Sequence, residues 1–155
     1  MTLIAFFSAT GKTRALAERI SKILGADLYE IEPQEKYTKA DLIWVNPFSR
    51  SSKEMKNKSS RPAIKDQPLD LSKYDTIYLG FPIWWYVAPT IVNTFLEKFD
   101  FSGKKIIPFA TSGGSKMGGT NAGLQVSCPN ASLLEGDVLN KMTDEQLADW
   151  LKTHC

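Results

Sequence analysis

The sequence predicts an α/β protein of three layers, in which helices cover both faces of an open, doubly wound parallel sheet of five strands. Residues 3–7 are continuously apolar, as in a parallel strand that is buried on both faces. Residues 12–24 switch to the helical spacing of apolar side chains, and Gly25 follows where a glycine is expected to end a helix. Residues 27–31 return to a strand pattern. Strand, helix and strand in this order form a βαβ unit. Five such strand and helix units along the chain predict the doubly wound sheet.

The composition is that of one globular domain, residues 1–155. A net charge of +2 is too small to indicate nucleic acid or an anionic membrane as a partner. Two cysteines, Cys128 and Cys155, and one histidine are too few for a zinc site. The chain starts without a basic leader segment and has no apolar run of transmembrane length, so we expect a cytoplasmic protein with reduced thiols.

The segment 48–61 has an excess of positive charge, with five basic side chains and one acidic side chain. We expect a solvated surface loop here, and a docking patch is the alternative. Leu69 and Leu71 are expected to return the chain to the core. Upstream, Thr38 and Asp41 have capping-box spacing, which predicts a short helix over residues 38–45.

The rest of the chain continues the alternation of strands and helices. Pro108 removes one hydrogen-bond donor from the fourth expected strand, which argues against a central position in the sheet. Thr143 and Gln146 form a capping box before the last helix, with Met142 and Leu147 at hydrophobic-staple positions. The expected elements are strands at residues 76–81, 105–110 and 131–134, and helices that begin near Pro89, cover residues 118–126 and follow Thr143.

A hydroxyl-rich turn, residues 8–13, connects the first strand to the first helix. A helix N-terminus presents unpaired backbone N–H groups and a partial positive charge, and therefore favours a phosphate. Three hydroxyls would add donors, and one lysine supplies a positive charge. The candidate phosphate-binding residues are Ser8, Ala9, Thr10, Gly11, Lys12 and Thr13.

Two other interpretations of this turn remain. Residues 11–13 match the end of the P-loop of nucleotide triphosphatases, but the first glycine of that motif would fall at Phe6, whose side chain denies a triphosphate its backbone nest. An ordinary helix cap, with Thr10 as the N-cap residue, is the second alternative. Loops further along the chain must decide between these interpretations.

Three consecutive aromatic residues, Trp84, Trp85 and Tyr86, follow the third expected strand. They cannot all point into the core, and clustered exposed aromatic side chains mark a binding surface. A flat heteroaromatic ligand could stack on them. Pro82 and Ile83 complete this candidate ligand loop. A hydrophobic cap over the sheet edge or an oligomer contact is the alternative.

Glycine and serine are frequent in residues 111–119, after the fourth expected strand. Paired glycines let the backbone approach a ligand and offer N–H donors. Ligands of open α/β sheets bind beyond the carboxyl ends of the strands, so the loops after strands one, three and four are expected to converge. The candidate residues of this third loop are Thr111, Ser112, Gly113, Gly114 and Ser115.

Residues 8–13, 80–85 and 111–115 together resemble the three FMN-binding loops of flavodoxin-like proteins, nearest the short, tryptophan-bearing branch. The resemblance covers essentially the whole chain. It implies a sheet of order 2-1-3-4-5 and one noncovalently bound FMN. The phosphate would lie in the first loop and the isoalloxazine ring between the other two. The candidate residues of the three loops would then bind the cofactor.

Electron-carrier flavodoxins are typically acidic, whereas this chain is mildly basic. Residues 80–86 and 111–119 contain no Asp or Glu, and Lys116 lies in the second of these segments. We therefore expect the bound flavin to have a less negative redox potential than in acidic flavodoxins. The favoured function is electron transfer to redox partner proteins or small electron acceptors, with no catalytic side chain.

Two other functions stay open. One is an FMN-dependent NAD(P)H:quinone oxidoreductase, although the sequence has no second dinucleotide fingerprint such as G-x-G-x-x-G. The other is a binding module that keeps the flavodoxin fold without the cofactor. The hydroxyls and the glycine at the first helix start argue against that module, because a protein-docking surface does not need them.

Overall fold

The computed structural model of the chain describes residues 1–43, 45–112 and 116–153. Its centre is a parallel sheet of order β2-β1-β3-β4-β5, and a further short strand, β6, also pairs with β4. The predicted α/β class and the order 2-1-3-4-5 are confirmed. The strands are β1 Thr2–Phe6, β2 Asp27–Glu30, β3 Thr76–Pro82, β4 Lys105–Thr111, β5 Ser132–Leu133 and β6 Asp137–Val138.

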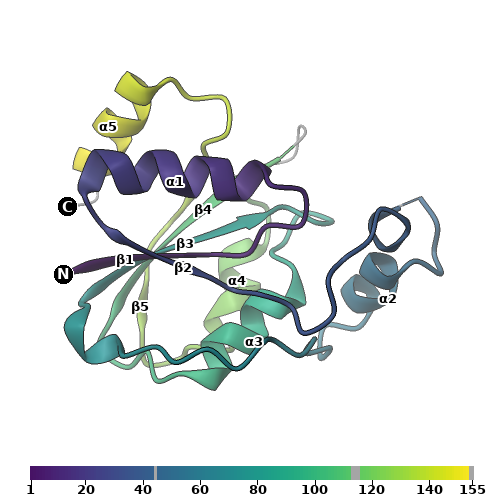
Figure 1. Ribbon diagram of the computed structural model, residues 1–155. Helices are drawn as coiled ribbons and strands as arrows, with labels where there is room; N and C mark the ends of the chain where they lie inside the picture. Colours follow the sequence, from purple (N-terminus) through teal and green to yellow (C-terminus); the bar gives the residue numbers. More distant parts are fainter. Residues whose placement is uncertain (44, 113–115, 154–155) are drawn as a thin grey trace.

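Helices cover both faces of the sheet: α1 and α5 lie on one face, and α3 and α4 lie on the other (Figure 1). In the described part of the chain, every helix is too short or too polar to cross a membrane. The α-helices are α1 Lys12–Leu24, α2 Arg50–Lys56, α3 Thr90–Lys98, α4 Thr120–Gln125 and α5 Asp144–Lys152, and short 3-10 helices cover Ala40–Leu42 and Leu71–Lys73.

Each face of the sheet has its own hydrophobic core. Side chains of β1, and of Phe7 directly after it, contribute to both cores. Ile4 and Phe6 pack with α1 and α5, whereas Leu3, Ala5 and Phe7 pack with α3 and α4. All five side chains are at most 4% exposed. Burial on both faces explains why this strand is continuously apolar instead of alternating.

Pro108 lies inside the sheet, because β4 pairs with β3 on one side and with β5 and β6 on the other. The carbonyl groups of Ile106 and Ala110 accept hydrogen bonds from the fifth-strand side, so the missing N–H of Pro108 faces that side as well. Pairing is interrupted there, between β5 and β6. At this gap Gly136 crosses so close that a Cβ atom would lie 2.1 Å from the Pro108 carbonyl oxygen. Pro108 therefore interrupts the neighbouring strand, which is split into β5 and β6, while β4 itself is continuous.

The prediction of an irregular loop over residues 48–61 is wrong, because α2 lies within it. Ser49 caps this helix by accepting a hydrogen bond from the Ser52 N–H. The helix predicted over residues 38–45 is only the 3-10 turn Ala40–Leu42, although Thr38 and Asp41 make the reciprocal capping bonds, of 3.1 and 2.9 Å. Together these segments form a lobe beside the sheet (Figure 1).

The predicted end of α1 and the predicted start of α5 are confirmed. Gly25 ends α1 in the left-handed conformation, with φ 64°, and its N–H bonds to the Ser21 carbonyl oxygen at 2.8 Å. Thr143 and Gln146 form the complete capping box of α5. Leu71 is buried against the core, as predicted.

Candidate ligand-binding site

The loops after β1, β3 and β4 converge and are joined directly to one another. The Thr13 and Thr111 hydroxyl oxygens lie 2.9 Å apart in a buried hydrogen bond. The Ile83 N–H donates to the Thr111 carbonyl oxygen at 2.9 Å, and the Phe7 N–H donates to the Gly80 carbonyl oxygen at 2.9 Å. The bond between Thr13 and Thr111 thus fixes the start of α1 against the end of β4.

The first loop presents the N-terminus of α1 without a side-chain cap. Gly11 is the N-cap residue, with φ 93°, and it makes no side-chain capping bond. Its N–H bonds to the Ser8 hydroxyl oxygen at 3.0 Å. The alternative of an ordinary cap by Thr10 is wrong, because Thr10 lies outside the cap position and is exposed. A helix of 13 residues therefore directs its N-terminal N–H groups at the loop.

The remaining first-loop residues differ in exposure. Ala9 is half-buried, Lys12 is exposed and Thr13 is buried. Phe6 is only 4% exposed at the end of β1, so no wide backbone nest can form at the position that a P-loop requires.

Residues 84–87, which we call the aromatic turn, form a tight hairpin. Trp84 and Val87 exchange two backbone hydrogen bonds, of 2.9 and 3.1 Å. Trp85 and Tyr86, at the two central positions, have φ angles of 48° and 65°. A turn with two positive φ angles normally contains Asn and Gly, because each L-residue in the left-handed region costs about 1–2 kcal/mol. The turn therefore holds two large side chains in an unfavourable backbone conformation.

The three aromatic side chains have different environments. Trp84 packs inward, in edge contacts with Phe7 and Tyr37 at centroid distances of 5.9 and 5.5 Å. Trp85 is 41% exposed and Tyr86 is 65% exposed. Trp84 is thus half-buried against the core, whereas Trp85 and Tyr86 are the exposed rings of the turn. Pro82 and Ile83 are half-buried at the base of the turn.

The aromatic turn is supported by the start of the α4 region. The Gly119 N–H donates to the Tyr86 carbonyl oxygen at 3.1 Å. Gly118, with φ 54°, passes so close that a Cβ atom would lie 2.5 Å from the same oxygen. The sequence predicts that paired glycines in residues 111–119 approach a ligand, and the structure places these two glycines against the aromatic turn.

The third loop is described only at its start. Thr111 is buried, and Ser112 exchanges two hydrogen bonds with the Asn140 side chain, at 3.2 and 3.1 Å. Sequence analysis did not identify Asn140, which has no motif around it. Gly113, Gly114 and Ser115 lie outside the described residues.

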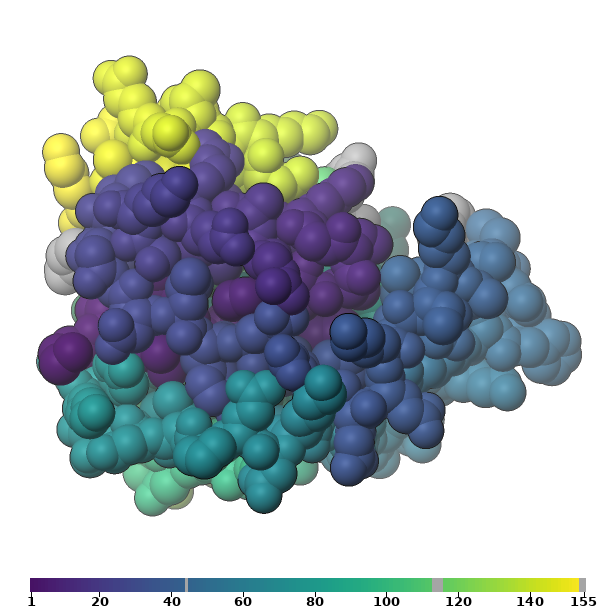
Figure 2. All heavy atoms as spheres, in the orientation of Figure 1, coloured from purple at the N-terminus to yellow at the C-terminus, as the bar shows by residue number. Residues whose placement is uncertain are grey.

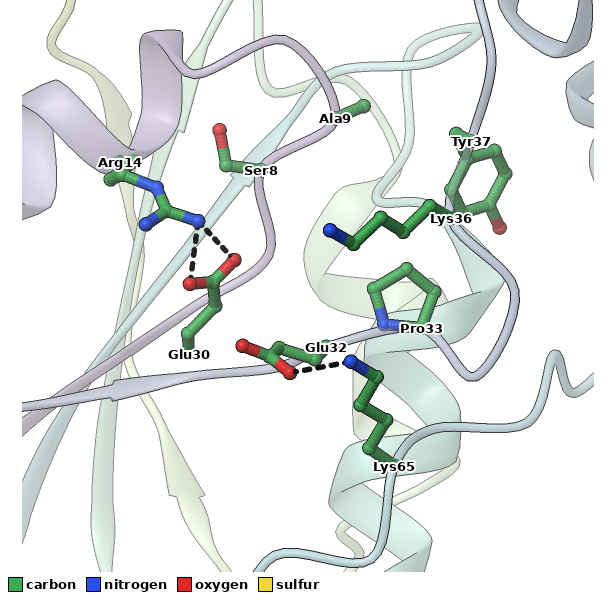
Figure 3. Close-up of a pocket in the computed structure, with 9 residues that line it drawn as sticks. All are labelled: Ser8, Ala9, Arg14, Glu30, Glu32, Pro33, Lys36, Tyr37 and Lys65. Carbon is green, nitrogen blue, oxygen red and sulfur yellow. Dashed lines mark hydrogen bonds and ion pairs between the residues drawn. The ribbon is translucent and has the colours of Figure 1, made fainter.

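A pocket of about 220 Å³ adjoins the first loop, between Ser8, Ala9 and the chain that follows β2 (Figure 3). Two ion pairs cross it: Arg14 bonds to both oxygens of Glu30, at 2.6 and 2.5 Å, and Lys65 lies 3.3 Å from Glu32. Lys36 directs its ammonium group into the pocket (Figure 3) and makes no ion pair with any described residue. Sequence analysis did not identify these residues, because their charges lie on three separate segments.

Tyr37 joins this pocket to the lobe. Its hydroxyl donates to Glu54 at 2.5 Å, and the Arg50 guanidinium, which pairs with Glu54 at 3.0 Å, lies 3.9 Å from the centroid of its ring. Burial first, and then the hydrogen bond to Glu54, raise the pKa of Tyr37 above its ordinary value. The tyrosine is therefore a neutral donor that holds α2 against the core.

Among the described residues, no group of three or more His, Cys, Asp and Glu side chains is arranged to hold a metal ion. What the site offers is an uncapped helix N-terminus with hydroxyl groups, two exposed rings and neighbouring backbone donors. This donor set suits a phosphorylated, planar organic ligand.

A doubly wound sheet whose loops meet at such a helix start defines a class of α/β proteins that bind nucleotide-like cofactors. The chain belongs to the flavodoxin family, since the family model described as Flavodoxin matches residues 1–154.

Similar proteins support this assignment. The chain is 32% identical over 113 residues to Flavodoxin 1 of Escherichia coli strain K12. The aligned region covers 70% of this chain and 48% of that protein. The chain thus spans about half the length of the curated relatives it matches.

Solved structures match over nearly the full chain. A candidate flavoprotein of Bacteroides uniformis ATCC 8492 is 47% identical, with 97% of both chains covered and a TM-score of 0.92. One of Bacteroides eggerthii DSM 20697 is 44% identical, with 98% of this chain and 96% of that chain covered and a TM-score of 0.92. A flavoprotein of Lactobacillus acidophilus NCFM in complex with FMN shares the fold at 21% identity and a TM-score of 0.74, covering 94% and 97% of the two chains.

Proposed function

We propose that residues 1–155 form one FMN-binding domain that transfers electrons through a noncovalently bound FMN. The observation that carries the proposal is the uncapped N-terminus of α1, surrounded by hydroxyl groups and joined to the two other loops. Membership of the flavodoxin family and the FMN complex of the Lactobacillus acidophilus protein support it. Bound FMN supplies the electron-transfer chemistry, and the chain binds and orients it.

The first loop would hold the phosphate. The N–H groups at the start of α1 and the hydroxyls of Ser8 and Thr10 can donate to it, while Thr13, held by Thr111, fixes the helix start. Each hydrogen bond to a charged group contributes about 1.5–3 kcal/mol, so a few of them suffice to hold a dianion. Lys12 and Lys36 add positive charge at the two sides of the loop.

The ring of the flavin would contact the aromatic turn and the third loop. Trp85 and Tyr86 are the exposed rings, and their strained backbone indicates that the turn is shaped for presenting them. Residues 111–115, Gly113, Gly114 and Ser115 included, would face the polar edge of the ring. With no carboxylate in residues 80–86 or 111–119, a reduced, anionic flavin meets less repulsion than in an acidic flavodoxin.

The test of the phosphate position is Thr10→Leu. Thr10 is exposed, so we expect unchanged far-UV circular dichroism and unfolding free energy. The affinity for FMN should fall at least about tenfold, because one charge-assisted hydrogen bond is lost and a bulky side chain enters the loop. Thr10→Ser is the control and should bind like the wild type. Undiminished affinity of Thr10→Leu would show that the phosphate lies elsewhere.

An electron carrier and an NAD(P)H:quinone oxidoreductase differ in whether they catalyse steady oxidation of NADH or NADPH by a quinone. We expect the FMN-loaded protein to exchange electrons with redox proteins or small acceptors, and to show no sustained oxidation of NADH or NADPH with a quinone. Steady turnover with both substrates would favour the NAD(P)H:quinone oxidoreductase instead. A cytoplasmic location is part of the proposal, and the free, buried thiol of Cys128 supports it.

A further inference from the structure

The positive segment 48–61 contributes to a surface that electron transfer through FMN alone does not explain. We call this surface the lobe face. It combines apolar and basic side chains of the α2 lobe with the tip of the aromatic turn, and Figure 2 shows the lobe projecting from the body of the protein. The members of the lobe face are Ile43, Val45, Phe48, Lys53, Lys56, Lys58, Trp85 and Tyr86.

Large apolar side chains of the lobe face are exposed. Phe48 is 78% exposed, Val45 is 68% exposed and Ile43 is 46% exposed. A pocket of about 260 Å³ is lined by Val45, Met55 and Lys56 of the lobe and by Trp85 of the aromatic turn. The lobe and the turn therefore form one continuous surface, and a ring proposed to contact the flavin is part of it.

The charge of the lobe face is positive and unbalanced. Arg50 is neutralised by Glu54, at 3.0 Å, but Lys53, Lys56 and Lys58 form no ion pair with any residue that the structure describes. Interfaces between proteins that associate transiently combine apolar side chains with polar and charged ones. A positive charge attracts an acidic partner and repels a basic one.

The lobe is fixed to the core instead of being a solvated loop. The Arg50 guanidinium donates to the Glu35 carbonyl oxygen at 2.7 Å, and the Tyr37 hydroxyl donates to Glu54 at 2.5 Å. Ser60 bonds to Thr90 of α3 at 2.8 Å. A surface that is already ordered loses little conformational entropy when a partner binds.

We propose that the lobe face is the docking surface for an acidic electron-transfer protein, which reaches the flavin beside Trp85 and Tyr86. The inference rests on the proposed function, since it assigns a partner to the same flavin site. Charge complementarity selects the partner: the lobe carries three exposed lysines that lack an ion pair with any described residue, together with exposed apolar side chains, whereas the net charge of the whole chain is only +2.

The experiment compares two forms of one electron acceptor that carry opposite net charges. The FMN-loaded protein is reduced with dithionite, freed of excess reductant, and mixed in a stopped-flow instrument with native cytochrome c, which is basic, or with succinylated cytochrome c, which is acidic. Each ferric haem accepts one electron, so two cytochromes reoxidise one flavin, and the protons of the flavin pass to solvent. We expect the acidic form to react faster at about 10 mM ionic strength and to slow at least about tenfold at about 0.3 M.

Charge reversal locates the effect. The triple variant Lys53→Glu, Lys56→Glu and Lys58→Glu should reverse the preference between the two cytochromes while its FMN affinity stays that of the wild type. The control variant carries the same change in charge at exposed sites away from the lobe and should keep the wild-type preference. Its substitutions are Lys22→Glu, Lys73→Glu and Lys152→Glu.

The outcomes separate the two proposals. Absence of FMN binding would overturn both the proposed function and the docking surface. Normal FMN binding with no preference for the acidic cytochrome, or with equal effects of the two triple variants, would overturn the docking surface alone. Binding to vesicles of phosphatidylcholine and phosphatidylserine that only the lobe variant loses, without a change in cytochrome kinetics, would replace the acidic protein by a membrane.

Discussion

Replacing the central residues of the aromatic turn separates a ligand-binding role from a structural one. The double variant Trp85→Asn and Tyr86→Gly places at these positions the residues that a turn with two positive φ angles prefers. It removes the two exposed rings proposed to contact the flavin and leaves the half-buried Trp84 unchanged. The two readouts, folding stability and FMN affinity, should respond differently.

The expected change in stability is small because two contributions oppose each other. Relief of backbone strain stabilises the variant by about 2–4 kcal/mol, at about 1–2 kcal/mol for each residue. Trp85, 41% exposed, and Tyr86, 65% exposed, together cover about 200 Å², which is worth about 3–5 kcal/mol at about 25 cal/mol per Å² after correction for the denatured state. The unfolding free energy should therefore change by no more than about 3 kcal/mol.

The loss of FMN affinity in the double variant is not offset by the relief of backbone strain. Loss of ring contacts worth about 0.5–1.5 kcal/mol each beyond their buried area should raise the Kd of FMN about 100-fold or more. Quenching of flavin fluorescence measures the Kd, and urea denaturation of the apo protein measures stability. The control Tyr86→Phe keeps the ring and should bind normally. A double variant with unchanged FMN affinity would refute the assignment of these rings, and one that loses more than about 4 kcal/mol of stability would refute the strain argument.

Two further substitutions test the fold around the site. Tyr37→Phe removes the hydrogen bond to Glu54 and should lower the unfolding free energy at pH 7 by about 1–2 kcal/mol, measured by urea denaturation; an unchanged value would show that Tyr37 does not hold the lobe. Because the folded-state pKa of Tyr37 is raised, its contribution is present at lower pH and is lost as pH rises above about 10, so Tyr37→Phe should have the flatter alkaline stability profile. Gly80→Ala would place a Cβ atom 2.3 Å from the ring of buried Phe109 and should cost about 1–3 kcal/mol, which Phe109→Leu should partly restore. Equal stability of Gly80→Ala and wild type would contradict that close approach.

The sheet and its flanking helices could be predicted because their signals are local. The apolar spacing of residues 12–24 and the glycine after them determine α1, and Thr143 with Gln146 determines the start of α5. The convergence of the three loops followed from the topology of a parallel sheet, which places the carboxyl ends of its strands at one edge.

The lobe could not be predicted in the same way. Helix α2 has seven residues and only Ser51 and Ser52 are buried in it, so it lacks an apolar stripe. Polar contacts hold it instead, from Tyr37 to Glu54 and from Arg50 to Glu35, and no pattern along the chain shows such contacts between segments.

The roles of the three aromatic residues also required the structure. The turn contains neither Asn nor Gly at its central positions, so the usual signal of a tight hairpin is absent. Packing on Phe7 and Tyr37 leaves Trp84 half-buried, while the next two rings are exposed.

The central claim is that the first loop binds the phosphate of FMN. The most direct measurement is a fluorescence titration of the apo protein with FMN and, in parallel, with riboflavin, which has the same ring and no phosphate. Several hydrogen bonds to the dianion, each worth about 1.5–3 kcal/mol, predict that FMN binds at least about 100-fold more tightly than riboflavin. Equal affinities for the two flavins, or no binding of FMN, would contradict the claim.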